Sequence, residues 1–167
     1  VYSPLPGLTL RQALQSLDSS LRESLIERFG QFMAQLHERG VYFRSLHLGN
    51  VLVMDDGEFG LIDIADLRIF PSPLRNTLRQ RNLRHMQRYP QDRAWLFETH
   101  FEQLAKGYAC IASQGATNKI REQVLALALQ ELESVGLVRR EVLPTRPPST
   151  VYRATARADT ILGRRGD

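Results

Sequence analysis

The sequence has few of the features that adapt a chain to an oxidising compartment or to a membrane. It contains one cysteine, Cys110, so no internal disulfide and no multi-thiolate metal site can form. It has no apolar run near the roughly 18 residues that cross a bilayer, and its N-terminus has no basic patch followed by an apolar stretch. We therefore expect a cytoplasmic protein without a membrane span. Cys110, which lies among apolar neighbours, is expected to be a buried small hydrophobe.

Charge of one sign is also scarce, apart from one region. The 43% hydrophobic and 24% charged residues are the balance of a globular chain, and the net charge is only +4. From Leu137 onward, however, the sequence contains seven arginines and only three acidic residues. A basic end can contact nucleic acid or acidic lipid, or can simply be solvated, and charge alone favours the solvated tail.

The spacing of apolar residues predicts a mainly α-helical chain with a small β-hairpin, an α+β fold. Thr9 is suited to cap the first helix and Gly40 to end the second. Helices are expected over residues 10–17, 21–39, 71–88, 92–112 and 118–134. Strands are expected over residues 41–43, 51–54, 59–64, 137–141 and 150–154, the last two joined by a proline-rich turn at residues 144–148.

Polar residues are concentrated where the strands of the central hairpin begin and end. Asn50 closes a loop just before one strand, and Asp63 lies at the end of the return strand. The hairpin, with its turn at residues 55–57, brings these two ends together. An amide oxygen and a carboxylate that converge in this way suit Mg²⁺ carrying nucleotide phosphates, because such sites leave most ligand positions to water and phosphate.

This segment resembles the catalytic loop and magnesium loop of protein-kinase-like phosphotransferases. In that pattern the catalytic aspartate stands five residues before the metal-binding asparagine, as Ser45 stands before Asn50, and a second metal-binding aspartate follows one hairpin later, as Asp63 does. The stretches GVYFRSLHLGN (residues 40–50) and LIDIADLR (residues 61–68) are most similar to bacterial lipopolysaccharide core (Kdo/heptose) kinases and toluene-tolerance phosphotransferase-like proteins.

The resemblance covers residues 1–112 and implies a kinase-like C-terminal lobe, because no glycine-rich loop or strand lysine precedes it. It implies ATP and Mg²⁺ as cofactors, held by Asn50 and Asp63, with a sugar or other small polar acceptor. Arg44 would orient the loop. Because Ser45 occupies the position of the catalytic aspartate and cannot accept a proton as a carboxylate does, we expect weak or no catalysis and a pseudokinase-like binding role. If some catalysis survives, His47 or Asp66 is the candidate for a substitute base.

Other polar residues near this segment have simpler interpretations. His37 is interpreted as a structural residue at a helix end, and His85 and His100 as surface or packing residues. Asp66 and Arg68 are expected to form a local ion pair or to anchor the loop. The following arginines are interpreted as a solvated helix face, although a polyanionic substrate would suit them: Arg75, Arg79, Arg81, Arg84 and Arg88.

The remaining segment, residues 113–167, is expected to form a helix and a wing-like hairpin. Residues 129–142 and 144–155 resemble the second half of a winged-helix regulator of the HxlR type, including the paired prolines of its wing. This likeness implies an alternative function in DNA binding, with a helix in the major groove and arginines of the wing on phosphate. The residues it implicates are Asn118, Lys119, Arg121, Arg139, Arg140 and Arg153.

Overall fold

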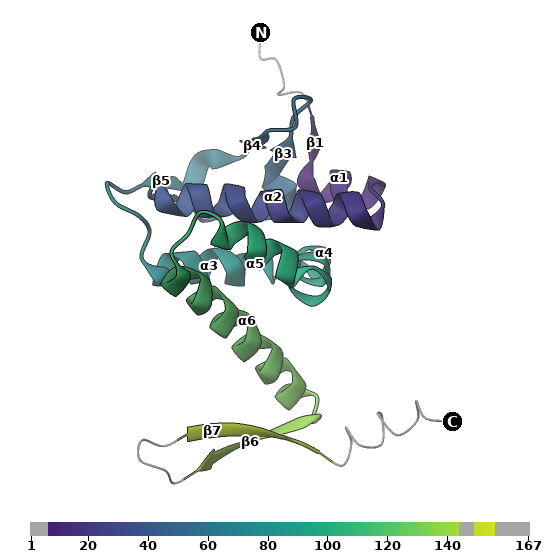
Figure 1. The fold of residues 1–167 in the computed structure, drawn as a ribbon, viewed down its shortest axis with the longest axis vertical. Coiled ribbons are helices and arrows are strands. Elements are labelled where there is room, and N and C mark those ends of the chain that lie inside the picture. The colour runs from purple at the N-terminus through teal and green to yellow at the C-terminus, as the bar shows by residue number, and fades with distance from the viewer. Residues whose placement is uncertain (1–6, 144–148, 156–167) are drawn as a thin grey trace. The chain divides into compact units, whose positions relative to one another are not determined.

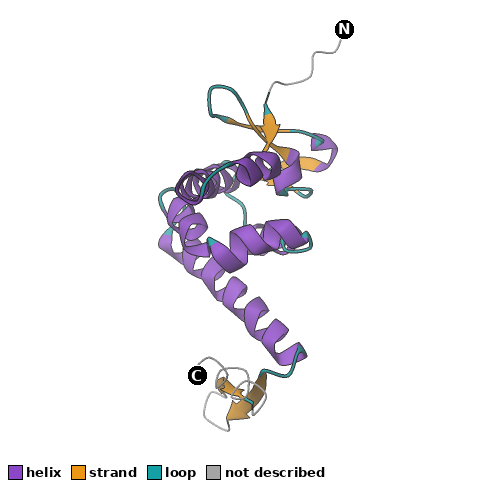
Figure 2. Cartoon of the chain, turned by 90° about the vertical axis from the view of Figure 1, so that its right-hand side faces the viewer, coloured by secondary structure: helices purple, strands orange, loops and turns teal. Residues whose placement is uncertain are grey.

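The computed structural model describes residues 7–143 and 149–155 and divides into two compact units, residues 1–121 and 122–167 (Figure 1). Helices predominate and the strands are short, as Figure 2 shows. The fold is therefore α+β, as predicted. The unit boundary lies inside a helix, whereas the sequence suggested a division between residues 112 and 113. No described helix is both long enough and apolar enough to cross a bilayer.

Helix α1 begins where the sequence places its cap, and α2 begins two residues before its expected start at residue 21. After the short strand β1 (Leu8–Thr9), helix α1 (Leu10–Ser16) starts with a reciprocal capping box between Thr9 and Gln12. Helix α2 (Ser19–Glu38) is capped by Asp18, whose carboxylate accepts the Leu21 amide at 2.9 Å. Gly40, at φ +73°, turns the chain after α2 as predicted.

The core of the first unit is centred on the crossing of α2 and α5 (Phe101–Ala109). Two glycines allow the helix backbones to approach closely. A Cβ on Gly107 would overlap the Glu27 carbonyl, and one on Gly30 would overlap the Leu104 carbonyl. In Figure 1, α5 lies on one side of α2 and the three-stranded sheet on the other.

Two small antiparallel sheets position the central loops. The strands that follow β1 are β2 (Val41–Phe43), β3 (Val51–Val53), β4 (Phe59–Leu61) and β5 (Leu67–Ile69). The three-stranded sheet β1-β3-β4 pairs Val51 with Leu61, and the two-stranded sheet β2-β5 pairs Phe43 with Leu67. Two single-turn 3-10 helices, η1 (Leu48–Asn50) and η2 (Ile64–Asp66), lie in the connections between the sheets. The loop after β2 and the segment before β5 are therefore neighbours.

The expected helix over residues 71–88 is shorter than predicted. Helix α3 spans Asn76–Met86, because Pro71 and Pro73 keep the chain extended before it. Leu74 in this extended segment donates its amide to the His37 carbonyl at 2.8 Å. The prolines thus shift the start of the helix to Asn76, and the Leu74 bond holds the extended segment against the end of α2.

The expected helix over residues 92–112 is broken into pieces. It comprises α4 (Pro90–Arg93), the π-helix η3 (Ala94–Thr99) and α5. The break lies at buried His100, whose amide bonds to the Trp95 carbonyl at 3.0 Å. Cys110 follows α5 and is exposed. Its prediction as a buried hydrophobe is wrong, because its neighbour Tyr108 takes the face of α5 that turns to the core.

Helix α6 (Gln114–Ser134) spans the unit boundary, and its end leads to the antiparallel hairpin of β6 (Val138–Leu143) and β7 (Ser149–Ala154). The helix ends at Ser134 as the sequence predicts, and Gly136, at φ +74°, turns the chain after it. Strand register pairs Val138 with Ala154. The predicted proline-rich turn at residues 144–148 lies outside the described residues.

Candidate active site

A buried chain of hydrogen bonds fixes the start of the loop that follows β2. The Asn82 side-chain amide donates to the Phe43 carbonyl at 2.7 Å. His37 lies behind Asn82, with Nε2 3.1 Å from Asn82 Oδ1 and Nδ1 2.9 Å from the Tyr108 hydroxyl. Burial lowers the pKa of His37 to about 3, so the ring is neutral, and its bonds place the proton on Nε2. His37 is thus a structural residue, as its position in the sequence suggested.

Arg79 extends this buried network and departs from its interpretation as a solvated residue. It is only 4% exposed. Its guanidinium donates to the Leu74 carbonyl at 2.8 Å, to Glu38 at 2.9 Å and to the Tyr108 hydroxyl at 2.8 Å. The prediction of a uniformly solvated arginine face is therefore wrong at Arg79, because its partners come from elements that sequence spacing cannot relate to α3.

Asp92 holds the second half of the same loop. Its fully buried carboxylate accepts the Leu48 amide at 2.8 Å through Oδ2. Its other oxygen forms an ion pair with Arg11 from α1, at 2.8–2.9 Å. Sequence reasoning missed this role. The partners lie 44 and 81 residues away in the chain, so no local pattern links them.

Asn50 precedes β3 and Asp63 follows β4, so both lie at one end of the hairpin as predicted, although the return strand ends at Leu61 and not at residue 64. The Ile62 amide donates to the Asn50 carbonyl at 3.0 Å, and the Asn50 side-chain amide donates to the Ser45 carbonyl at 3.1 Å. That second bond leaves the Asn50 side-chain oxygen available as a ligand. The Asp63 carboxylate is exposed and caps no helix amide.

The backbone of Asp63 is strained. It has φ +54° and is the one non-glycine residue with positive φ in the described part of the chain. Such conformations cost about 1–3 kcal/mol and are concentrated at functional sites. Two hard oxygen ligands fit Mg²⁺, which takes few protein ligands beside water and phosphate. Within the described ranges no group of three or more His, Cys, Asp or Glu is arranged to hold a metal ion.

The serine at the expected catalytic position is bonded to a carboxylate. Ser45 Oγ donates to Asp66 Oδ2 at 2.6 Å, and the Ser45 amide lies 3.4 Å from Asp66 Oδ1. Asp66 belongs to η2, which the β2–β5 pairing brings beside the loop. Asp66 therefore anchors the loop, as one of its two interpretations held. The other interpretation, an ion pair with Arg68, is wrong, since no described acidic group pairs with Arg68.

His47 has a local structural task. Its Nδ1 accepts the Gly49 amide at 3.0 Å and so caps η1, while its ring packs against the Tyr89 ring, tilted by 38° with centroids 4.4 Å apart. Desolvation by burial lowers the pKa of His47, which favours the neutral ring. With Nδ1 engaged in the cap, only Nε2 remains for chemistry, and a role for His47 as a base stays a prediction.

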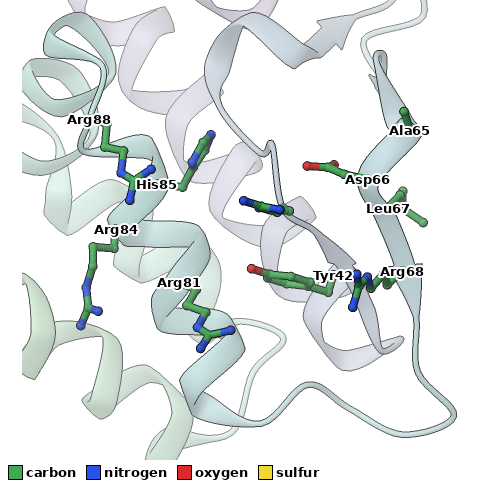
Figure 3. A pocket seen from close by; sticks show the side chains of 10 residues that line it. Tyr42, Ala65, Asp66, Leu67, Arg68, Arg81, Arg84, His85 and Arg88 are labelled. Carbon is green, nitrogen blue, oxygen red and sulfur yellow. The ribbon is translucent and has the colours of Figure 1, made fainter.

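A cavity of about 650 Å³ is lined by Asp66 and by several basic residues, which give it a strong positive charge. Figure 3 shows Asp66 and Arg68 on one wall and Arg81, Arg84, His85 and Arg88 on the facing helical segment. The lining contains five arginines, and none of them forms an ion pair in the described part of the chain: Arg44, Arg68, Arg81, Arg84 and Arg88. Three arginines interpreted as a solvated face thus gather around a pocket suited to anions.

The residues implicated in DNA binding lie in several settings. Asn118 and Lys119 are exposed on α6, and Arg139 and Arg140 are exposed on β6. The other two are engaged in ion pairs: Arg121 with Glu102 at 2.9 Å, and Arg153 with Glu141 at 2.8 Å. In the hairpin register Arg153 pairs with Arg139, so β6 and β7 bring basic residues together.

Two family models match the chain. The model of the HxlR-like helix-turn-helix matches residues 104–163, which include most of α5, all of α6 and the β6–β7 hairpin. No curated protein matches the chain. The model described as lipopolysaccharide kinase (Kdo/WaaP) family matches residues 8–108, which contain the loop after β2, the β3–β4 hairpin and the arginine-lined cavity. Since this match covers more than half of the sequence, the chain belongs to the lipopolysaccharide kinase (Kdo/WaaP) family.

Proposed function

We propose that the protein is a kinase-like phosphotransferase whose C-terminal-lobe site binds Mg²⁺-ATP through Asn50 and Asp63. The carrying observation is that both residues lie at one end of a hairpin, with an available amide oxygen, an exposed carboxylate and a strained backbone at Asp63. When bound, the ion supplies positive charge to the nucleotide phosphates. The protein's own contribution is the fixed placement of the loop by Asn82 and Asp92.

The proposed acceptor is an anionic sugar, such as a lipopolysaccharide sugar bearing carboxylate or phosphate. Five arginines around one cavity favour such a group, because a guanidinium binds carboxylate and phosphate through paired hydrogen bonds. The cavity is lined by Arg44, the chain neighbour of Ser45, and by Asp66, which binds the Ser45 hydroxyl, and Ser45 stands where the kinase pattern has its catalytic aspartate. An acceptor held there by the arginines would present its hydroxyl to the loop.

Mg²⁺-ATP binding can be tested by thermal shift on the wild-type protein, on Asp63→Ala and on Asp55→Ala. Asp55 is an exposed acid in the turn of the same hairpin and so provides a matched change of charge. Ligand at 100 times Kd stabilises a folded protein by about 2.7 kcal/mol. We expect a Mg²⁺-dependent rise in Tm for the wild type and Asp55→Ala but not for Asp63→Ala. The absence of a rise in the wild type would refute the nucleotide site.

DNA binding is a second candidate function, favoured by the HxlR-like match and by the basic β6–β7 hairpin. Fluorescence anisotropy with duplex DNA at several salt concentrations tests it. Replacing Arg139 and Arg140 by glutamine should weaken binding and lower the salt slope by about 2, since each lost phosphate contact removes about one. The matched control replaces exposed Arg39 and Arg75 of the first unit. If the two double variants behave alike, the hairpin is not the DNA contact.

A further inference from the structure

The loop after β2 lacks a carboxylate of its own at position 45, yet a carboxylate from another segment lies there. Asp66 approaches Ser45 through two contacts, one from the hydroxyl at 2.6 Å and one from the amide at 3.4 Å. The residues are 21 positions apart in the chain. Both lie in a part of the first unit where β2 and β5 are paired, so the contact is built into the sheet register.

Asp66 has an oxygen left for chemistry. Its Oδ2 accepts the short bond from Ser45 Oγ, whereas Oδ1 has only the long contact with the Ser45 amide. The side chain is partly exposed and lines the arginine cavity (Figure 3). A hydroxyl that enters this cavity can therefore reach Oδ1, while the Ser45 hydroxyl fixes the carboxylate from its other side.

We propose that Asp66 is the general base of the phosphotransferase and that Ser45 is its positioning residue; this inference rests on the proposed function. The acceptor hydroxyl loses its proton to Asp66 Oδ1 as its oxygen forms a bond to the γ-phosphorus of ATP. The bond from that phosphorus to the bridging oxygen breaks, and ADP leaves with the bonding electrons. The carboxylate missing at position 45 is thus supplied by η2, and catalysis survives the substitution.

A different role for the same pair is nucleophilic attack by Ser45 itself, with Asp66 as its base. The two roles predict different effects of the substitution Ser45→Ala on phosphate transfer. If Asp66 is the base for the acceptor, Ser45→Ala loosens the carboxylate and lowers kcat only about tenfold, the effect of losing one hydrogen bond to a charged group. If Ser45 is the nucleophile, Ser45→Ala abolishes transfer, and the wild type forms phosphoserine.

The experiment measures transfer of radiolabelled γ-phosphate from Mg²⁺-ATP to Kdo-bearing rough lipopolysaccharide. The variants are Asp66→Asn, Ser45→Ala and the double variant Ser45→Asp/Asp66→Asn, with Asp55→Asn as matched control. We expect Asp66→Asn to lower kcat by about 10²-fold or more, the usual contribution of a general base. The double variant should recover at least about tenfold, because its carboxylate stands where the kinase pattern has one. The Kd for Mg²⁺-ATP, measured by calorimetry, should stay within about twofold of the wild-type value for every variant.

Each contrary outcome overturns the inference. An Asp66→Asn variant with near wild-type kcat, or a Ser45→Ala variant as inactive as Asp66→Asn, removes Asp66 from the role of base for the acceptor. Wild-type protein that binds Mg²⁺-ATP but transfers no phosphate refutes the inference and leaves the nucleotide site standing. Wild-type protein that does not bind Mg²⁺-ATP refutes both, so the two failures are distinguishable.

Discussion

Buried His37 should make the fold sensitive to acid. Its pKa is lowered from 6.5 to about 3, mainly by desolvation, so the folded protein keeps the ring neutral while the unfolded chain protonates it below pH 6.5. Because the unfolded state then binds more protons, the free energy of unfolding decreases as pH falls. The contribution of His37 is complete above about pH 6.5 and is lost progressively toward about pH 3.

The expected loss in the free energy of unfolding follows from how far the pH is lowered below 6.5. One pKa unit corresponds to about 1.4 kcal/mol, so two units below 6.5, at about pH 4.5, the loss is about 2.7 kcal/mol. This is a large part of the roughly 5–15 kcal/mol that stabilises an ordinary domain. Protonation would also convert Nδ1, which accepts the Tyr108 hydroxyl, into a donor, and would break the bond between His37 and Tyr108 while Nε2 still donates to Asn82.

Urea unfolding followed by circular dichroism near pH 7.5 and near pH 4.5 measures the effect on the wild type and on His37→Gln. Between the two pH values the wild type should lose about 2.7 kcal/mol more than the variant. His47 and His85, whose pKa values are also lowered by burial, contribute equally to both proteins and cancel. Equal losses in the two proteins would refute the reasoning. NMR titration of the wild-type ring, expected to stay neutral to about pH 3, is independent of how the variant folds.

Three further predictions concern packing and charge. Gly107→Ala should lower the free energy of unfolding, measured in urea, by about 1–3 kcal/mol or more, because the added Cβ would overlap the backbone of α2. Gly115→Ala, whose added Cβ has no neighbour within 4 Å, should leave the stability unchanged or slightly higher. Asp92→Asn should cost about 3–5 kcal/mol and speed hydrogen exchange of the Leu48 amide, because the variant breaks a buried ion pair. Arg121→Ala should change stability by less than about 1 kcal/mol, since its ion pair is at the surface.

Sequence patterns predicted the elements whose signals are local. The Thr9 cap, the turn at Gly40 and the placement of Asn50 and Asp63 at one end of the hairpin each depend on residues close together in the chain or joined by one hairpin. Side-chain chemistry and spacing suffice for such features, because the partners are fixed relative to one another by a single turn or strand pair.

The contacts that sequence reasoning missed join distant segments. Arg79 was assigned to a solvated face, but Glu38 and Tyr108 come from two other helices and bury it. Asp66 was expected to anchor the loop, but its particular bond to Ser45 depends on how β2 pairs with β5, which neither residue's surroundings in the sequence reveal. The Ser45–Asp66 contact depends on the register of β2 and β5, and the Arg79 contacts depend on how α2, α3 and α5 pack. Both are set by tertiary packing.

The same distant contacts explain how the loop keeps its shape with Phe43 and Ser45 at the positions where the kinase catalytic triplet, His-Arg-Asp, has its histidine and its aspartate. Asn82 and Asn50 bind the carbonyls of Phe43 and Ser45, and Asp92 binds an amide of η1. All three act on main-chain groups, which every amino acid supplies, so the loop conformation does not depend on the side chains at positions 43 and 45. In the proposed mechanism such a site needs a carboxylate near position 45, and the carboxylate held by the Ser45 hydroxyl would meet that need. A departure from the triplet is therefore weak evidence against catalysis, and the position of the nearest carboxylate is the better criterion.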